Sequence, residues 1–168
     1  TLALAAAHGA QSDVPDGAAW VELAPLADPD MLVSVVAREL GIPVPGSNPQ
    51  AAFVKALAER RMLLVLDNCE HVLRPVSRLV DAIVRACPAV RILATSREGL
   101  GLAGERIVVV GSLQVLEATA DIEDVSGSDA VRLFVDRAQA ARSGFALDTA
   151  SAGAVVQICE RLDGVPLA

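Results

Sequence analysis

Aromatic residues are nearly missing from this 168-residue chain, in which phenylalanine and tryptophan together make up 2% and tyrosine does not occur. The chain therefore has few rings on which nucleic-acid bases could stack. Basic residues are also in deficit, because 14 Lys and Arg stand against 21 Asp and Glu and leave a net charge of -7. A surface of that sign repels a phosphate backbone. The composition argues against direct nucleic-acid binding by this segment.

Cysteines and long apolar runs are scarce as well. Cys69, Cys87 and Cys159 lie far apart, without the CxxC spacing of a zinc site or a redox pair. We expect all three thiols to be buried in a reducing cytoplasm. Although 53% of the residues are hydrophobic, no run approaches the roughly 20 apolar residues of a membrane span, and no signal peptide is visible. The sequence predicts a soluble, cytoplasmic protein without membrane contact.

The first two thirds of the chain alternate short apolar runs with helical periodicity. Strands are predicted at 18–24, 62–66, 91–95 and 106–110. Helices are predicted at the start of the chain, after Asp28-Pro29, after Asn48-Pro49 and over 76–87. In the second and third of these, Asp or Asn supplies an N-cap acceptor and Pro suits the first helical position. Strands separated by helices of about 10 to 15 residues indicate parallel pairing in a three-layer α/β domain.

The pattern changes to helices alone near residue 128. Two amphipathic stretches, SDAVRLFVDRAQAAR and DTASAGAVVQICERL, each carry one apolar stripe. Residues 116–127 are acidic and lack periodicity. We therefore predict an α/β core over 1–115, a linker over 116–127 and the beginning of a small helical domain over 128–168.

Polar residues follow two of the predicted buried strands. Asp67 ends one strand, and Thr95-Ser96-Arg97 ends the next. Ligands of open parallel sheets bind at the carboxyl ends of the strands, where a carboxylate can hold Mg²⁺ and a guanidinium can reach a phosphoryl group. The pair predicts a nucleoside triphosphate site. Two simpler interpretations stay open: Asp67 as a helix N-cap and Arg97 as one half of a surface ion pair.

Four stretches also carry a family resemblance. LLVLDNCEHVL, RILATSREGLGLAGERIVVVGSL, VRLFVDRAQ and ICERLDGVPLA occur in this order. Together they resemble the ATPase module of the STAND class, the NB-ARC-like, AAA-like P-loop core of bacterial LuxR-type and SARP-type transcriptional regulators. The resemblance covers nearly the whole chain. It implies a three-layer P-loop fold, followed by a helical lid domain, that binds ATP or ADP with Mg²⁺.

The resemblance implies a role for each residue at the two strand ends. Asp67 matches the Walker B aspartate that organises Mg²⁺. Asn68 stands where many relatives have a second acid, and an amide orients water but is a poor base. Glu70 is either a substitute for that acid or an ordinary residue at the start of a helix. Thr95 and Arg97 belong to the sensor motif, in which the arginine reads the γ-phosphate.

The resemblance also concerns both ends of the chain. GVPLA is similar to the family's GLPLA motif, so Gly164 and Pro166 would approach the adenine and ribose; a plain helix break explains the same two residues. No GxxxxGK[ST] occurs, yet TLALAAA resembles the helix after a P-loop, which makes Thr1 the magnesium-binding hydroxyl residue or its successor. The family pattern as we interpret it places the P-loop strand between strands 62–66 and 91–95. Without that strand we expect these residues alone to be marginally stable and inactive.

The function implied is a nucleotide-controlled switch. The exchange of ADP for ATP would open the helical domain, act on DNA-binding and sensor domains outside this chain, and permit self-association, while slow ATP hydrolysis in the intact protein would reset the state. An alternative is a scaffold that does not hydrolyse ATP and docks partners. A turnover enzyme is disfavoured, because no substrate-binding constellation appears beyond the nucleotide.

Overall fold

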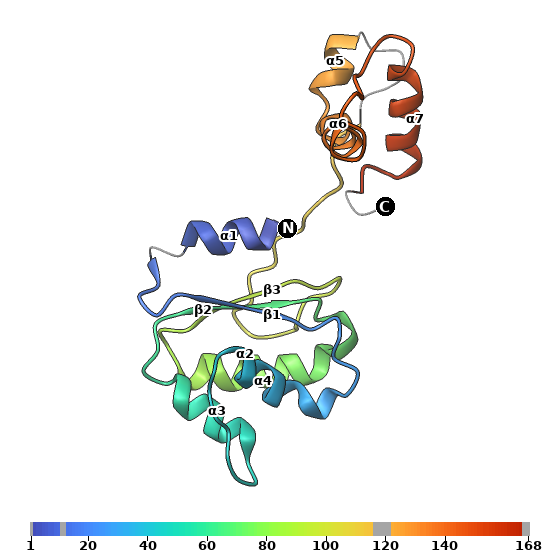
Figure 1. The fold of residues 1–168 in the computed structure, drawn as a ribbon. Coiled ribbons are helices and arrows are strands. Elements are labelled where there is room, and N and C mark those ends of the chain that lie inside the picture. The colour runs from blue at the N-terminus through green and yellow to red at the C-terminus, as the bar shows by residue number, and fades with distance from the viewer. Residues whose placement is uncertain (1, 11–12, 116–121, 166–168) are drawn as a thin grey trace. The chain divides into compact units, whose positions relative to one another are not determined.

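The computed structural model describes residues 2–10, 13–115 and 122–165 (Figure 1). The chain divides into two compact units, Thr1–Ile107 and Val108–Ala168. Each unit has a hydrophobic core of its own. Two predicted site residues, Thr1 and Pro166, lie outside the described residues.

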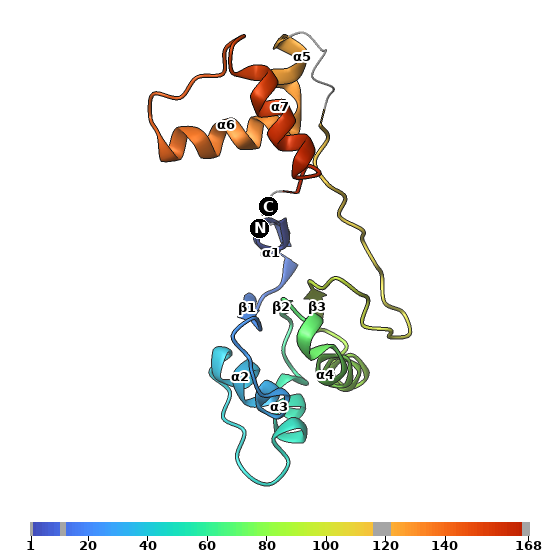
Figure 2. The ribbon, with the colours of Figure 1, turned by 90° about the vertical axis from the view of Figure 1, so that its right-hand side faces the viewer.

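A parallel sheet of three strands forms the centre of the first unit. The strands are β1 (Ala18–Glu22), β2 (Leu63–Asp67) and β3 (Arg91–Ala94), in the order β1-β2-β3 (Figure 2). The predicted strands 18–24, 62–66 and 91–95 are thus confirmed. β2 is the middle strand, and its first four residues are buried. Burial on both faces is the reason that its sequence is an uninterrupted apolar run.

Helices cover both faces of this sheet. They are α1 (Leu2–Ala10), α2 (Leu32–Glu39), α3 (Pro49–Leu57) and α4 (Leu73–Ala86), with 3₁₀ turns η2 (Pro29–Met31) and η3 (Glu70–Val72). α1 lies on one face and α2, α3 and α4 lie on the other (Figure 1). Alternate strand residues divide between the two layers: Leu63 and Val65 share a cluster with Ala7 of α1, whereas Leu64 and Leu66 join the larger core. The first unit is therefore a three-layer α/β domain.

The two predicted helix starts have the expected chemistry. Asp28 accepts a hydrogen bond from the Asp30 amide at 3.0 Å, and Asn48 accepts one from the Ala51 amide at 3.0 Å. The proline after each cap occupies the start of the helix, where its missing N–H is not needed. Local sequence therefore determines where these helices begin.

Two predictions about the sheet are wrong. Residues 106–110 form no strand, and Ile107, Val108, Val109 and Val110 are 64%, 73%, 87% and 68% exposed. β-branched residues favour a strand, but a strand also needs a neighbour, and no described strand pairs with this segment. The second error concerns β2 and β3, between which we expected a missing strand. They pair directly, from Leu63↔Arg91 to Leu66↔Ala94, so no strand is missing between them.

The second unit consists of helices, as predicted for the residues from 128 onward. α5 (Ile122–Gly127), α6 (Asp129–Ala141) and α7 (Ala152–Arg161) enclose a small core that includes Val131, Val155 and Val156. α5 occupies the described part of the stretch 116–127, for which the sequence indicated a linker. Nowhere in the described ranges is a helix both long enough and apolar enough to cross a bilayer.

Candidate functional site

The carboxyl ends of β2 and β3 lie side by side. Leu66 pairs with Ala94, so the next residues, Asp67 and Thr95, emerge at the same edge of the sheet. Asp67 is half-buried and is the last residue of its strand. The predicted neighbourhood of Asp67 and the Thr95-Ser96-Arg97 segment is therefore present, because parallel pairing aligns the two strand ends.

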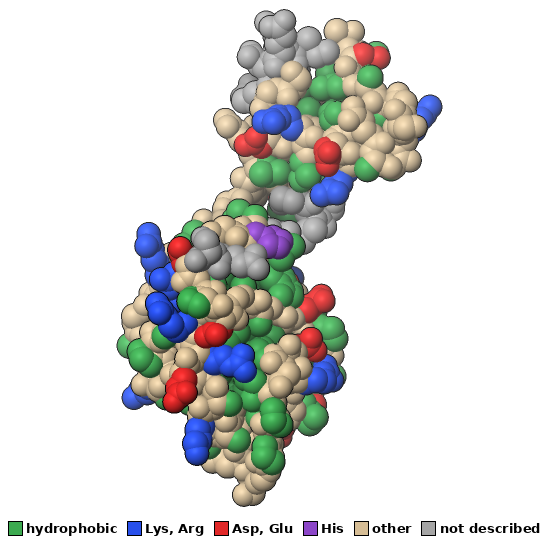
Figure 3. All heavy atoms as spheres, turned by 60° about the vertical axis from the view of Figure 1, so that its left-hand side comes forward, with side chains coloured by type: hydrophobic (Ala, Val, Ile, Leu, Met, Phe, Trp, Pro, Cys, Tyr) green, Lys and Arg blue, Asp and Glu red, His purple; other side chains and the backbone are tan. Residues whose placement is uncertain are grey.

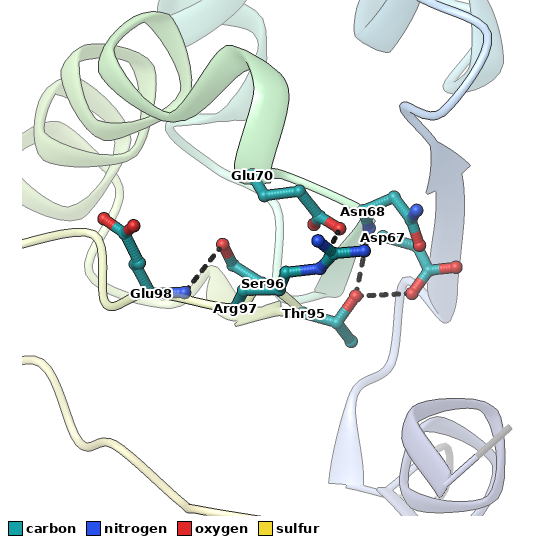
Figure 4. A network of polar contacts seen from close by, with 7 residues as sticks. All are labelled: Asp67, Asn68, Glu70, Thr95, Ser96, Arg97 and Glu98. Atoms are coloured by element: carbon teal, nitrogen blue, oxygen red, sulfur yellow. Dashed lines mark hydrogen bonds and ion pairs between the residues drawn. The ribbon is translucent and has the colours of Figure 1, made fainter. Parts of the chain in front are cut away.

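Thr95 connects the two strand ends through four hydrogen bonds, and those from its hydroxyl to Asp67 and Asn68 are drawn in Figure 4. Its hydroxyl donates to Asp67 Oδ1 at 2.5 Å and accepts from the Asn68 amide at 3.0 Å. Its own amide donates to the Leu66 carbonyl oxygen at 2.9 Å, and its carbonyl oxygen accepts from the Cys69 amide at 2.9 Å. Thr95 thus contacts every residue from Leu66 to Cys69.

Asn68 has an unusual backbone conformation. Its φ of 60° lies in the left-handed region, which is uncommon for residues other than glycine, although asparagine tolerates it better than most. The Asn68 side chain is exposed, while its amide is held by Thr95. Such strained positions concentrate at ligand sites, and this one turns the chain sharply out of β2.

Arg97 contacts Glu70 in this structure. Its Nε lies 3.5 Å from Glu70 Oε1, and the two side chains are 87% and 29% exposed. The surface-ion-pair interpretation of Arg97 therefore describes its present contact. An exposed pair of this kind contributes only about 0 to 1 kcal/mol, so the guanidinium can leave Glu70 for a stronger anion at little cost.

A carboxylate organises the loop that follows Arg97. Glu105 accepts hydrogen bonds from the amides of Leu100 at 2.7 Å, Gly101 at 2.9 Å and Leu102 at 3.4 Å. Ser77 of α4 donates to the Leu100 carbonyl oxygen at 2.9 Å. Sequence reasoning missed this arrangement. The signal that could have found it is an acid directly after the glycine-rich stretch GLGLAG, because successive backbone amides in such turns form anion-binding concavities.

The residues after Asn68 are structural. Cys69 is fully buried, and its burial, together with the carboxylates of Glu70 and Asp67, raises the pKa of its thiol to about 12. His71 Nε2 lies 3.1 Å from the Leu26 carbonyl oxygen and so ties the start of η3 to the loop after β1. All three cysteines are free and buried, as expected.

Asp67 has the chemistry of a magnesium ligand. Mg²⁺ in nucleotide sites is held by one or two carboxylates together with phosphate oxygens and water. Asp67 Oδ1 is occupied by Thr95, and no described residue makes a hydrogen bond with the other carboxylate oxygen, Oδ2. Clusters of three or more metal-ligating side chains do not occur among the described residues. The residues fit an ion that arrives with a phosphate better than one bound by protein alone.

Gly164 lies in the second unit, just after α7. Its φ is 64°, and a Cβ at this position would collide with the Leu113 carbonyl oxygen. The Leu113 amide donates to the Gly164 carbonyl oxygen at 2.9 Å. A cavity of about 190 Å³ adjoins this contact and is lined by Phe134, Arg137 and Val165 among others. The end of helix α7 thus explains why glycine stands at position 164. Gly164 also lines a small, mostly apolar cavity.

The first unit shows no single-sign surface on the face drawn in Figure 3. Lys and Arg side chains there are interspersed with acidic and hydrophobic ones. Several basic side chains have an acidic neighbour, such as Arg85 with Asp81 at 2.9 Å and Arg91 with Asp13 at 4.0 Å.

Comparison with known proteins finds similarity to mycobacterial regulators. The chain is 40% identical over 158 residues to a protein of Mycobacterium tuberculosis provisionally named an HTH-type transcriptional regulator, and a Mycobacterium bovis counterpart gives the same values. The match covers 94% of this chain and 17% of the regulator. An uncharacterized protein of M. tuberculosis is 41% identical over 148 residues, which are 88% of this chain and 35% of that protein. No family model and no solved structure matches the chain.

Proposed function

We propose that this chain is a nucleotide-binding module of a cytoplasmic, multidomain transcriptional regulator, in which bound ATP or ADP controls a regulatory state. The observation that carries the proposal is the juxtaposition of Asp67 with Thr95 and the segment leading to Arg97 at one edge of a parallel sheet. The similarity to regulators of which the chain spans 17% supports the multidomain context. The STAND-class, NB-ARC-like resemblance stays part of this proposal.

Each residue has a distinct task in the proposed site. Asp67 would hold Mg²⁺, which supplies charge neutralisation to the β- and γ-phosphates. Arg97 would leave Glu70 and contact the γ-phosphate, so that it distinguishes ATP from ADP. Gly164, Pro166 and Thr1 are the proposed contacts to the rest of the nucleotide. Regulation would act on DNA-binding and sensor domains of the same polypeptide and include nucleotide-dependent self-association.

A scaffold that does not hydrolyse ATP is the second candidate. The exposed side-chain carboxamide of Asn68 favours it, because this position follows the proposed metal-binding aspartate and holds no base. Glu70, the next acid along the chain, contacts Arg97 in this structure and would be released when Arg97 contacts the γ-phosphate. Slow hydrolysis and no hydrolysis therefore both agree with nucleotide binding, and they differ only in whether bound ATP decays to ADP.

Equilibrium binding of a fluorescent ATP analogue to the full-length polypeptide that contains these residues tests the proposal. Asp67→Ala should weaken binding in Mg²⁺ by about tenfold or more, since loss of a metal ligand costs at least as much as the 10- to 100-fold seen for outer-shell partners. Arg97→Ala should weaken ATP binding by about tenfold while leaving ADP binding nearly unchanged. Arg85→Ala, on an exposed ion pair of α4, is the matched control. Wild-type protein that binds neither ATP nor ADP would refute the proposal.

A further inference from the structure

We propose that Thr95 is a positioning residue that acts on the metal site through Asp67, rather than a direct ligand of the nucleotide. This inference rests on the proposed function and deepens it. The family resemblance placed Thr95 in the sensor motif together with Arg97, as a candidate contact of the nucleotide. The geometry separates the two residues: the Thr95 hydroxyl is held by two hydrogen bonds within the protein, whereas the Arg97 side chain is 87% exposed and, among the described residues, makes only an ion pair with Glu70.

The hydroxyl of Thr95 has one proton, and that proton is committed. It goes to Asp67 Oδ1 at 2.5 Å, within the range of strong hydrogen bonds between a hydroxyl and a carboxylate. A hydroxyl oxygen accepts as well, and the Asn68 amide at 3.0 Å takes that role. A hydroxyl bound in this way has no proton left to donate to a phosphate oxygen.

Fixing Oδ1 also determines the direction of Oδ2. A carboxylate is rigid and planar, so one short hydrogen bond to Oδ1 limits the rotation of the whole group. The backbone of Asp67 is held independently, because the Leu23 amide donates to its carbonyl oxygen at 2.9 Å. With both ends held, Oδ2 is the oxygen left to meet a metal ion or its water shell. Partners of this kind orient ligands and commonly affect metal affinity by 10- to 100-fold.

The same hydroxyl stabilises the turn at Asn68. The left-handed conformation at φ 60° is less favourable than the right-handed one even for asparagine. The bond from the Asn68 amide to Thr95 Oγ1 compensates for part of this cost. One side chain therefore supports both the carboxylate and the backbone turn beside it.

Thr95→Val tests this role, because valine keeps the shape of threonine and lacks the hydroxyl. In the full-length polypeptide, binding of a fluorescent ATP analogue is measured with Mg²⁺ and with EDTA. We expect Thr95→Val to reduce the Mg²⁺-dependent gain in affinity about tenfold and to leave affinity in EDTA unchanged. Thr95→Ser, which keeps the hydroxyl, should restore the gain. In an Asp67→Asn background, Thr95→Val should have no further effect on it.

A second measurement does not depend on nucleotide. Amide hydrogen exchange at Asn68 should accelerate in Thr95→Val and stay near the wild-type rate in Thr95→Ser, since only the serine hydroxyl can accept that N–H. Thr95→Ala provides a smaller replacement if valine prevents folding, and failure of both variants to fold would assign Thr95 a purely structural role and overturn the proposal.

The outcomes separate this inference from the proposed function. Equal losses with Mg²⁺ and with EDTA would make Thr95 a direct nucleotide contact and overturn the inference while nucleotide binding stands. An unchanged Mg²⁺-dependent gain in Thr95→Val would overturn it as well. Wild-type protein without nucleotide binding would remove the proposed function and the metal role of Thr95 together.

Discussion

The two units hold their candidate residues by different means. At the edge of the sheet, Asp67 and Asn68 are held by a hydroxyl 28 and 27 residues further along the chain. In the second unit, Gly164 is held by the end of a helix and by the close approach of the Leu113 backbone. The first arrangement depends on the hydroxyl oxygen of Thr95, and the second depends on the lack of a side chain at Gly164. Substitutions that remove atoms should therefore destabilise the first unit most, and substitutions that add atoms should destabilise the second unit most.

Truncation of a core side chain in β2 should have the largest effect. Leu66 is fully buried, and Leu66→Ala should lower the free energy of unfolding by about 3 kcal/mol through lost burial and the cavity left behind. Trp20 is the only tryptophan and lies in β1, so its fluorescence during urea unfolding reports on the first unit.

Val131→Ala, in the core of the second unit, is the matched comparison. Val131 is also fully buried, but its loss should leave the Trp20 transition unchanged if each core is stable by itself. A shift of the Trp20 transition by Val131→Ala as large as that by Leu66→Ala would show that the units unfold together.

Addition of a methyl group at Gly164 should affect the second unit next most strongly. Gly164→Ala places a Cβ against the Leu113 carbonyl oxygen at a positive φ, which should cost about 2 kcal/mol or more. Hydrogen exchange of α7 amides measures this loss.

Gly153→Ala, within α7 itself, has the opposite expected sign. No atom lies within 4 Å of a Cβ built there, and alanine favours a helix over glycine by about 1 kcal/mol. Equal destabilisation by the two substitutions would contradict the assignment of Gly164 to a position that requires glycine.

Neutralisation of Glu105 should have a smaller and local effect. Glu105→Gln keeps one acceptor oxygen but removes the charge that serves three amides, so stability should fall by about 1 kcal/mol. Exchange at Leu100, Gly101 and Leu102 should accelerate. Glu98→Gln, a change to a neighbouring exposed carboxylate in the same loop, should leave those rates unchanged; acceleration in both variants would argue against a specific cap.

Ionisation of the Cys69 thiol should have the smallest effect on the free energy of unfolding at neutral pH. Burial raises its pKa from 9.0 to about 12, so the folded thiol stays protonated while the unfolded one ionises. Ionisation then favours the unfolded state, and stability should decline as pH rises from about 9 towards about 12. Cys69→Ala should flatten this decline in pH-dependent urea unfolding. An identical pH profile in the variant would show that other groups cause it.

Several features of the first unit could be predicted from local sequence. The caps at Asp28 and Asn48, the buried run of β2 and the division into strands and helices each depend on residues close together in the chain. The alternation of Leu63 to Leu66 between the two faces of the sheet follows from the two-residue repeat of a strand. Asp67 and Arg97 were identified for the same reason, since each stands at or shortly after the end of a predicted strand.

Other features could not be predicted in this way. RIVVV at 106–110 has the composition of a strand, yet β structure requires a partner that composition does not specify. The sequence analysis wrongly placed a further strand between β2 and β3, because the order of strands depends on the whole sheet and not on the residues of any one strand. The pairing of Glu70 with Arg97 and the cap by Glu105 depend on the path of a loop between distant elements.

The sequence by itself determined the segments that form the three strands of the sheet, where two of the helices begin, and which polar side chains stand at strand ends, because these properties depend on short-range periodicity and capping. Only the tertiary structure decided that Thr95 donates to Asp67, that Arg97 meets Glu70 and that Gly164 has no room for a side chain. Each of these contacts joins groups from separate segments, and their positions depend on the packing of the unit in which they lie.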